Sequence, residues 1–402
     1  MASKISLTIK SQTAAGWWGV YYLLIATNAA SVLAWYLFYR FATFKMLHRR
    51  KEAKDLLFSF DWVGLCLYIA GMVTFLLGLQ WGGTLYPWKS AHVIAAMLAG
   101  TFGLVLFILW EWYLSRKSTK AVPFAPLWYM RNFKFMAITI MSGIGGSSYY
   151  GFSMIWPAAV ATDYTGLSNS ENSTLYGLVT MSHLYGQATI TLLSHWIVPK
   201  YLLIASMCIS CPILACVAIN PLNMSLTMGL IIVGCIFVGG MEGVALVTTT
   251  FPLRTQEEIG TAGGLSGTAP LFFSSVSAAI YAAVLNNRLA STIQANVVAA
   301  ATHAGLPTSS ILMLLTGLSG AAPLNSTTVP GLTPTILDLS SQAYRAAHAK
   351  AYSTVFLVSL AFTIPGVVLC WFTAKNDKAQ EDFVVGSIHK KGEEKELEDQ
   401  DG

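Results

Sequence analysis

Long apolar runs dominate the chain, and each is long enough to cross a lipid bilayer as a helix. A transmembrane helix needs about 20 mostly apolar residues. The runs that meet this requirement cover residues 18–39, 62–81, 91–114, 135–161, 174–196, 201–219, 226–251, 259–285 and 352–374. They are apolar on all sides and far longer than the alternating segments of a membrane barrel. The pattern therefore predicts an all-α, polytopic membrane protein with about nine transmembrane helices.

Basic residues divide unevenly between the connections that join these runs. If the connections alternate between the two faces of the membrane, one set holds 18 of the 24 Lys and Arg residues. The positive-inside rule makes that set cytoplasmic. Residues 1–17 and the connections 162–173, 220–225 and 286–350 are then expected outside, and the acidic tail 375–402 inside.

Three acceptor sequences for N-glycosylation agree with this sidedness. Asn172, Asn223 and Asn325 all precede the required Ser or Thr and all fall in connections expected outside. Asn172 and Asn223 are expected to lie too close to the membrane to be modified. Asn325 belongs to the long segment 286–350, whose apolar patch at 311–315 predicts a lid or a helix lying on the outer surface.

Composition excludes several classes of protein. With 54% hydrophobic and 11% charged residues, the chain is neither an ordinary soluble domain nor a disordered one. Its scattered net charge of +5 does not favour nucleic-acid binding. No HExxH, GxSxG or Walker A sequence is present, so we expect no enzyme activity, no metal and no cofactor. The cysteines lie in apolar runs, where packing is their usual role: Cys66, Cys208, Cys211, Cys216, Cys235 and Cys370.

Polar side chains inside the runs are the candidates for chemistry. Glu242 lies deep in run 226–251, where a carboxylate must be protonated, paired or in contact with water. His183 and Gln187 are one helical turn apart and share a face. Asn28 is a further candidate for the proton or substrate site. Glu111, between two tryptophans, is expected to extend to the cytoplasmic interface as an anchor.

Aromatic and small residues suggest a cavity and close helix contacts. Tyr149 and Tyr150 follow a run rich in Gly and Ser and suit a cavity for large organic molecules. Two GxxxG pairs predict tight, hinge-like packing of helices, and they are Gly239 with Gly243 and Gly263 with Gly267.

Four short motifs carry a family resemblance. They are residues 60–64 (FDWVG), 77–83 (LGLQWGG), 86–88 (YPW) and 110–113 (WEWY). In combination the chain resembles fungal major facilitator transporters with fourteen helices, of the trichothecene-efflux and siderophore-iron branch. The resemblance implies a partial major facilitator bundle that lacks five amino-terminal helices.

The resemblance also implies a division of the chain. Residues 18–60 would be the last helix of the amino-terminal half with a basic cytoplasmic loop, and residues 61–114 two inserted helices. After the cytoplasmic loop 115–134, residues 135–374 would form the carboxyl-terminal six-helix half.

The function that the resemblance implies is proton-coupled efflux of a toxin, drug or secondary metabolite by alternating access. Siderophore-iron uptake by proton symport and a non-transporting, truncated membrane remnant are the alternatives. The expected partners are the lipid bilayer, a small organic substrate and protons, and the expected location is the plasma membrane or the vacuole. The sequence fixes no oligomeric state.

Overall fold

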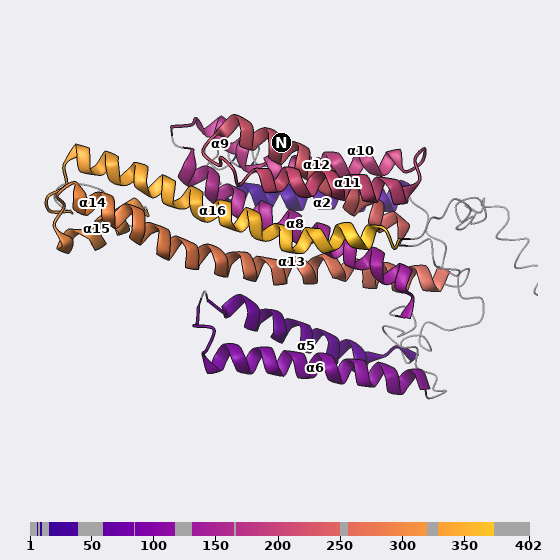
Figure 1. The fold of residues 1–402 in the computed structure, drawn as a ribbon. Helices are drawn as coiled ribbons and strands as arrows, with labels where there is room; N and C mark the ends of the chain where they lie inside the picture. Colours follow the sequence, from indigo (N-terminus) through magenta and orange to yellow (C-terminus); the bar gives the residue numbers. More distant parts are fainter. Residues whose placement is uncertain are drawn as a thin grey trace, which may run out of the picture.

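A computed structural model describes residues 16–38, 59–83, 85–116, 131–164, 166–249, 256–319 and 329–373, together with Ser6 and Ile9. A helix is present at each predicted run (Figure 1). These helices are α2 (Trp18–Phe38), α5 (Trp62–Trp81), α6 (Ala91–Arg116), α8 (Phe133–Asp163), α10 (Leu178–Leu193), α11 (Pro199–Cys216), α12 (Met224–Thr248), α13 (Gln256–Ile293) and α16 (Pro334–Cys370). The all-α fold class is confirmed.

Two of these helices are less apolar or shorter than the sequence predicts. Among the described residues, seven helices are long and apolar enough to cross a membrane, and α8 and α10 are not among them. α10 has only 16 residues and follows a separate short helix, α9 (Asn169–Tyr176). α8 has 31 residues but carries the Gly and Ser run at 142–148. Both helices contribute polar side chains to the pocket described below.

Helix α8 is central to the main bundle. It contacts α10, α12, α13 and α16, and its buried Trp156 belongs to a core cluster that includes Tyr281 of α13 and Phe356 of α16. The Trp156 indole Nε1 donates a hydrogen bond to the Leu175 carbonyl at 2.6 Å, so its one polar atom is satisfied inside the core. Helix α8 also contacts the short helix α9, so it packs against more than one side of the bundle.

The predicted outer segment 286–350 is mostly helical where the structure describes it. α13 continues through a π-helical turn, η1 (Gln294–Val298), into α14 (Ala299–His303), and a 3-10 turn, η2 (Thr308–Ser310), leads into α15 (Ile311–Leu318). α13 has 38 residues, about 57 Å at 1.5 Å per residue, against a hydrocarbon layer of about 30 Å. Helices α13 and α16 therefore take up residues 286–293 and 334–350 of the predicted connection, which shortens the stretch between them.

A small core of its own supports this protruding tip. Ala301, Leu306, Leu314, Val329 and Ile336 are buried together. Figure 1 shows α14 and α15 beside the start of α16, beyond the ends of α5, α6 and α9. The 311–315 patch thus forms a short helix at the tip. The connections 82–90 and 162–173 lie at this same end of the molecule, as alternation of the helices requires.

Helices α5 and α6 form a hairpin with a seven-residue repeat of buried positions. The buried residues of α5 include Gly64, Gly71 and Gly78, and those of α6 include Val93, Gly100, Phe107 and Leu114. Such spacing is the seam of a left-handed helix pair. A Cβ on Gly71 would lie 2.8 Å from the Leu104 nitrogen, so glycine is required for this close approach.

Glu111 lies in this seam, which corrects its predicted role. The residue is only 1% exposed, whereas its neighbour Trp112 is 47% exposed. Glu111 follows Phe107 by one turn and precedes Leu114 by nearly one turn, so it shares their buried face. It therefore does not extend to the interface as an anchor.

Asp61 fixes the start of the hairpin and yields the first testable prediction. Its carboxylate Oδ1 accepts hydrogen bonds from the Gly64 nitrogen at 2.8 Å and from the Trp110 indole Nε1 at 2.9 Å. We expect Asp61→Ala to lower the free energy of unfolding by about 1–2 kcal/mol, because both the helix cap and the tie to α6 are lost. Unfolding of the detergent-solubilised protein measures the effect. Asp61→Asn keeps the acceptor oxygen and is the control, so equal losses in both variants would contradict this role.

Candidate functional site

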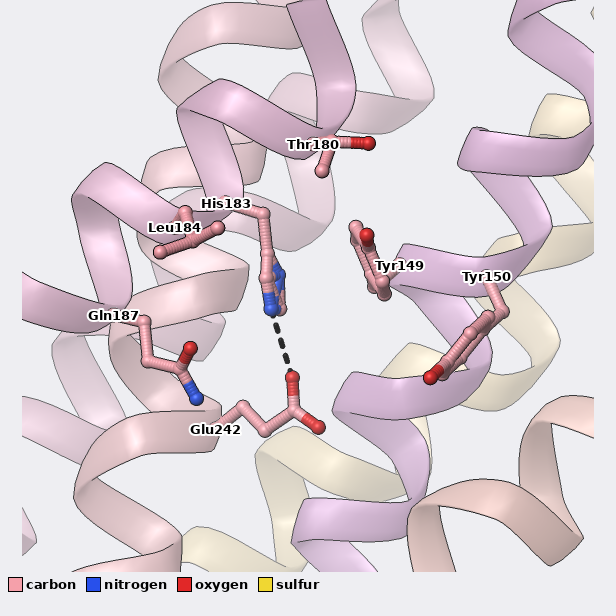
Figure 2. A pocket seen from close by; sticks show the side chains of 7 residues that line it. All are labelled: Tyr149, Tyr150, Thr180, His183, Leu184, Gln187 and Glu242. Atoms are coloured by element: carbon pink, nitrogen blue, oxygen red, sulfur yellow. Dashed lines mark ion pairs between the residues drawn. The ribbon is translucent and has the colours of Figure 1, made fainter. Parts of the chain in front are cut away.

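A pocket of about 210 Å³ lies where α8, α10 and α12 meet. Figure 2 shows the side chains of α10 and α12 on one side and those of α8 on the other. The lining residues are Tyr149, Tyr150, Thr180, His183, Leu184, Gln187 and Glu242. The pocket thus brings together five of the six residues that the sequence singles out for the proton or substrate site.

The centre of the pocket is a contact between His183 and Glu242. Imidazole Nε2 lies 2.9 Å from carboxylate Oε2, and the two side chains are 7% and 12% exposed. The contact is an ion pair when His183 carries both ring protons and Glu242 is ionised. It is a charged hydrogen bond when neutral His183 donates to ionised Glu242, and a neutral one when protonated Glu242 donates to neutral His183. His183 Nδ1 has no hydrogen-bond partner among the described residues. One proton can therefore change the charge of this site without a change of fold.

Aromatic rings cover the pair from the α8 side. The Tyr149 ring centroid lies 4.0 Å from that of His183, with a 47° angle between the planes. Tyr150 follows at 4.9 Å from Tyr149, edge to face. These rings offer flat apolar surfaces and two hydroxyl groups beside the titratable pair.

Glycines of α10 and α12 bring the polar residues together. A Cβ on Gly239 would overlap the His183 carbonyl, and one on Gly186 would overlap the Ile236 carbonyl. A Cβ on Gly243 would lie 3.0 Å from Gln187 Cγ. Because backbone meets backbone here, the side chains of His183 and Glu242 can bridge the two helices.

Other predicted site residues lie elsewhere. Asn28 is on the exposed helix α2, and its side-chain nitrogen donates to the Leu24 carbonyl of the same helix at 2.8 Å. It therefore does not reach the pocket. A Cβ on Gly263 or Gly267 would meet no described atom within 4 Å, so this GxxxG pair is not at a close helix contact in the described part of the chain.

The glycosylation acceptors differ in their surroundings. Asn172 is half-buried on α9, where its side-chain nitrogen faces the Leu167 carbonyl at 3.5 Å. Asn223 is exposed, and its oxygen caps α12 by accepting from the Leu226 nitrogen at 3.2 Å. Asn325, most of the loop 115–134 and the tail 375–402 lie outside the described residues.

The sequence analysis missed three residues of this site. Thr180 and Leu184 line the pocket, and Gly186 makes the close contact with α12. Helical spacing would have found the first two, since Thr180 lies three positions before His183 and Leu184 three positions before Gln187 on the same helix. Within the described ranges, no group of three or more His, Cys, Asp or Glu gathers.

Comparison with known proteins supports the same class of molecule. The family model described as "Fungal trichothecene efflux pump (TRI12)" matches residues 5–401. The chain is 26% identical over 358 residues to the trichothecene efflux pump TRI12 of Fusarium sporotrichioides, covering 88% of this chain and 59% of that protein. It is 29% identical over 327 residues to the MFS-type transporter prx5 of Penicillium rubens, covering 79% and 58%.

The lengths of these proteins differ from that of the chain. The chain spans 59% and 58% of these two curated relatives. In structure it aligns over 80% of its length, at 13% identity and a TM-score of 0.48, with a bacterial homologue of the human lysosomal transporter Spinster, inward-facing and occupied, of which it covers 65%. Because the family model covers nearly the whole chain, the chain belongs to the fungal trichothecene efflux pump family, which is a family of multi-pass membrane transporters and not of enzymes.

Proposed function

We propose that the protein takes part in proton-coupled efflux of a small organic molecule, by alternating access, with the α8–α10–α12 pocket as its binding site. The observation that carries the proposal is the contact between His183 and Glu242. His183 Nε2 and Glu242 Oε2 lie 2.9 Å apart, and two tyrosines line the same pocket. A buried carboxylate in a membrane bundle is expensive unless it is paired or protonated. Here His183 pairs with the carboxylate of Glu242 when it is ionised, and a bound proton neutralises it otherwise.

The pair gives the pocket two states of low energy. In one, ionised Glu242 accepts a hydrogen bond from neutral His183, and both side chains can also bind a ligand. In the other, the pair holds one more proton, either on the His183 ring as an ion pair or on the Glu242 carboxyl group. Proton binding and ligand binding then compete for the same two side chains, which is the requirement for exchange of one for the other.

The lining favours an oxygenated organic ligand. Tyr149 and Tyr150 offer hydroxyl groups and ring faces, and Gln187 offers an amide that both donates and accepts. A ligand with hydroxyl, ether or carbonyl oxygens on an apolar frame would use both features. The trichothecene efflux pumps among the relatives support this class and support export over the siderophore alternative.

The test is export from cells. The full chain would be expressed in yeast that lacks its own drug exporters, and retention of a labelled trichothecene would be followed. We expect expression to lower retention and a protonophore to restore it. Unchanged retention, with the protein shown to be in the plasma membrane by fractionation, would reject the proposal. The same fractionation decides between the plasma membrane and the vacuole.

A further inference from the structure

A second buried polar group lies at the predicted outer end of the bundle, away from the pocket. Asp163 is the last residue of α8 and is only 7% exposed. It belongs to the predicted outer connection 162–173, beyond the run that ends at residue 161. Its carboxylate Oδ1 accepts a hydrogen bond from the Thr162 hydroxyl at 3.2 Å. The Thr162 hydroxyl also lies 3.5 Å from the Tyr352 hydroxyl of α16, so this group joins the two helices.

Helix α16 presents a row of titratable residues to the same place. Arg345, His348 and Tyr352 are spaced by three and four residues and so share one face. His348 is 7% exposed, and neither ring nitrogen has a hydrogen-bond partner among the described residues. The Tyr344 and Tyr352 ring centroids flank it at 4.3 and 5.8 Å. The cluster therefore contains a buried imidazole as well as a buried carboxyl.

The groups that interact with Asp163 belong to the end of α8 and to α16. Burial raises the pKa of Asp163 to about 7, whereas the Thr162 hydrogen bond and the positive charge of Arg345 lower it. Burial also lowers the pKa of His348. Tyr164, next in the chain, donates to the Pro221 carbonyl at 2.6 Å. On α9, the carboxylate of exposed Glu171 is held by Ser168.

We propose that Asp163, together with Thr162 of α8 and Arg345, His348 and Tyr352 of α16, forms a proton-binding site at the outer end of the bundle. It is separate from the pocket, because Asp163 follows Tyr149 by 14 residues on the same helix, about 21 Å. With Asp163 protonated, no carboxylate charge is enclosed at the contact between α8 and α16, and the Thr162 hydroxyl lies between Asp163 and Tyr352. With Asp163 ionised, a charge is enclosed there that Arg345 offsets less than burial penalises it, and the outer ends of the two helices pack less firmly.

The expected pH dependence follows from the direction of the shift. The folded protein holds the Asp163 proton to about pH 7, whereas an unfolded chain releases it near the ordinary value of 3.8. The stability that this proton gives is therefore fully present below about pH 4 and is lost as the pH rises through about 7. The pH of the external medium would thus control how firmly the outer ends of α8 and α16 pack together.

The experiment measures thermal unfolding of the full chain in detergent across this pH range. We expect the wild type to lose stability up to about pH 7, and Asp163→Asn to lose that step. Asp338→Asn is the matched control, since Asp338 is exposed on the same end of α16, and it should keep the step. Retention of the step in Asp163→Asn, or its loss in Asp338→Asn, would overturn the proposal.

A second variant covers the case in which Asp163→Asn does not fold. Thr162→Val keeps the shape of the side chain but removes the hydrogen bond that lowers the pKa of Asp163. The step should then move to higher pH, and an unmoved step would also overturn the proposal. Because neither measurement uses transport, the outer site stands or falls separately from the proposed export.

Discussion

Replacement of Glu242 by Gln is expected to abolish the dependence of export on the proton gradient while the bundle remains folded. The amide keeps a hydrogen bond to His183 but cannot gain or lose a proton. The 2.9 Å contact thus becomes fixed in one state. The amide keeps a neutral hydrogen bond but loses the charge-assisted one, which contributes about 1.5–3 kcal/mol. We therefore expect the export that remains under an imposed proton gradient to be lower than in the wild type by about tenfold or more.

The measurement is uptake of a labelled substrate into inverted membrane vesicles with an imposed pH gradient. Glu171→Gln is the matched control, because Glu171 lies on α9, is exposed and bonds only locally to Ser168 among the contacts described. We expect this control to transport like the wild type. Undiminished, gradient-dependent uptake by Glu242→Gln would remove Glu242 from the proton pathway.

Replacement of Gly239 by Ala is expected to give the largest loss of stability. The added methyl group would overlap the backbone carbonyl of His183, and a backbone atom cannot move aside as a side chain can. We expect a loss of about 3 kcal/mol in the free energy of unfolding, together with a wider separation of α10 from α12. Equilibrium unfolding in mixed micelles would measure it.

Glycine 229 offers a control within the same helix. A Cβ on Gly229 would meet no described atom within 4 Å, so Gly229→Ala should leave stability unchanged or raise it slightly through better helix propensity. Equal losses in the two variants would show that the effect comes from the helix and not from its contact with α10.

The long helices were predictable because the bilayer imposes a length and an apolar composition on each of them. The limits of α13 and α16 were not, since both helices continue beyond the apolar runs 259–285 and 352–374 into more polar sequence. The sequence does contain a signal for the start of α16. Thr333 caps α16 by accepting from the Ile336 nitrogen at 3.3 Å, and Pro334 follows it. A threonine before a proline is a typical helix start.

The site was predictable in part for a similar reason. The shared face of His183 and Gln187 follows from helical spacing alone, whereas the contact of His183 with Glu242 joins helices that are far apart in sequence. Asn28 was included because it is polar within an apolar run, but its side chain bonds to its own helix at Leu24. Polarity identifies a candidate, and tertiary packing decides which candidates meet.

The hairpin of α5 and α6 has a consequence for assembly in the bilayer. The buried glycines of α5 pack against α6, within the hairpin. Among the described residues, few contacts join the hairpin to the main bundle; one is the hydrogen bond that the Gln80 amide donates to the Ser275 carbonyl of α13 at 3.3 Å. Two helices of this kind can associate as soon as the second of them leaves the ribosome. The later helices would then dock against a finished unit, and the hairpin could shift as one body during the transport cycle.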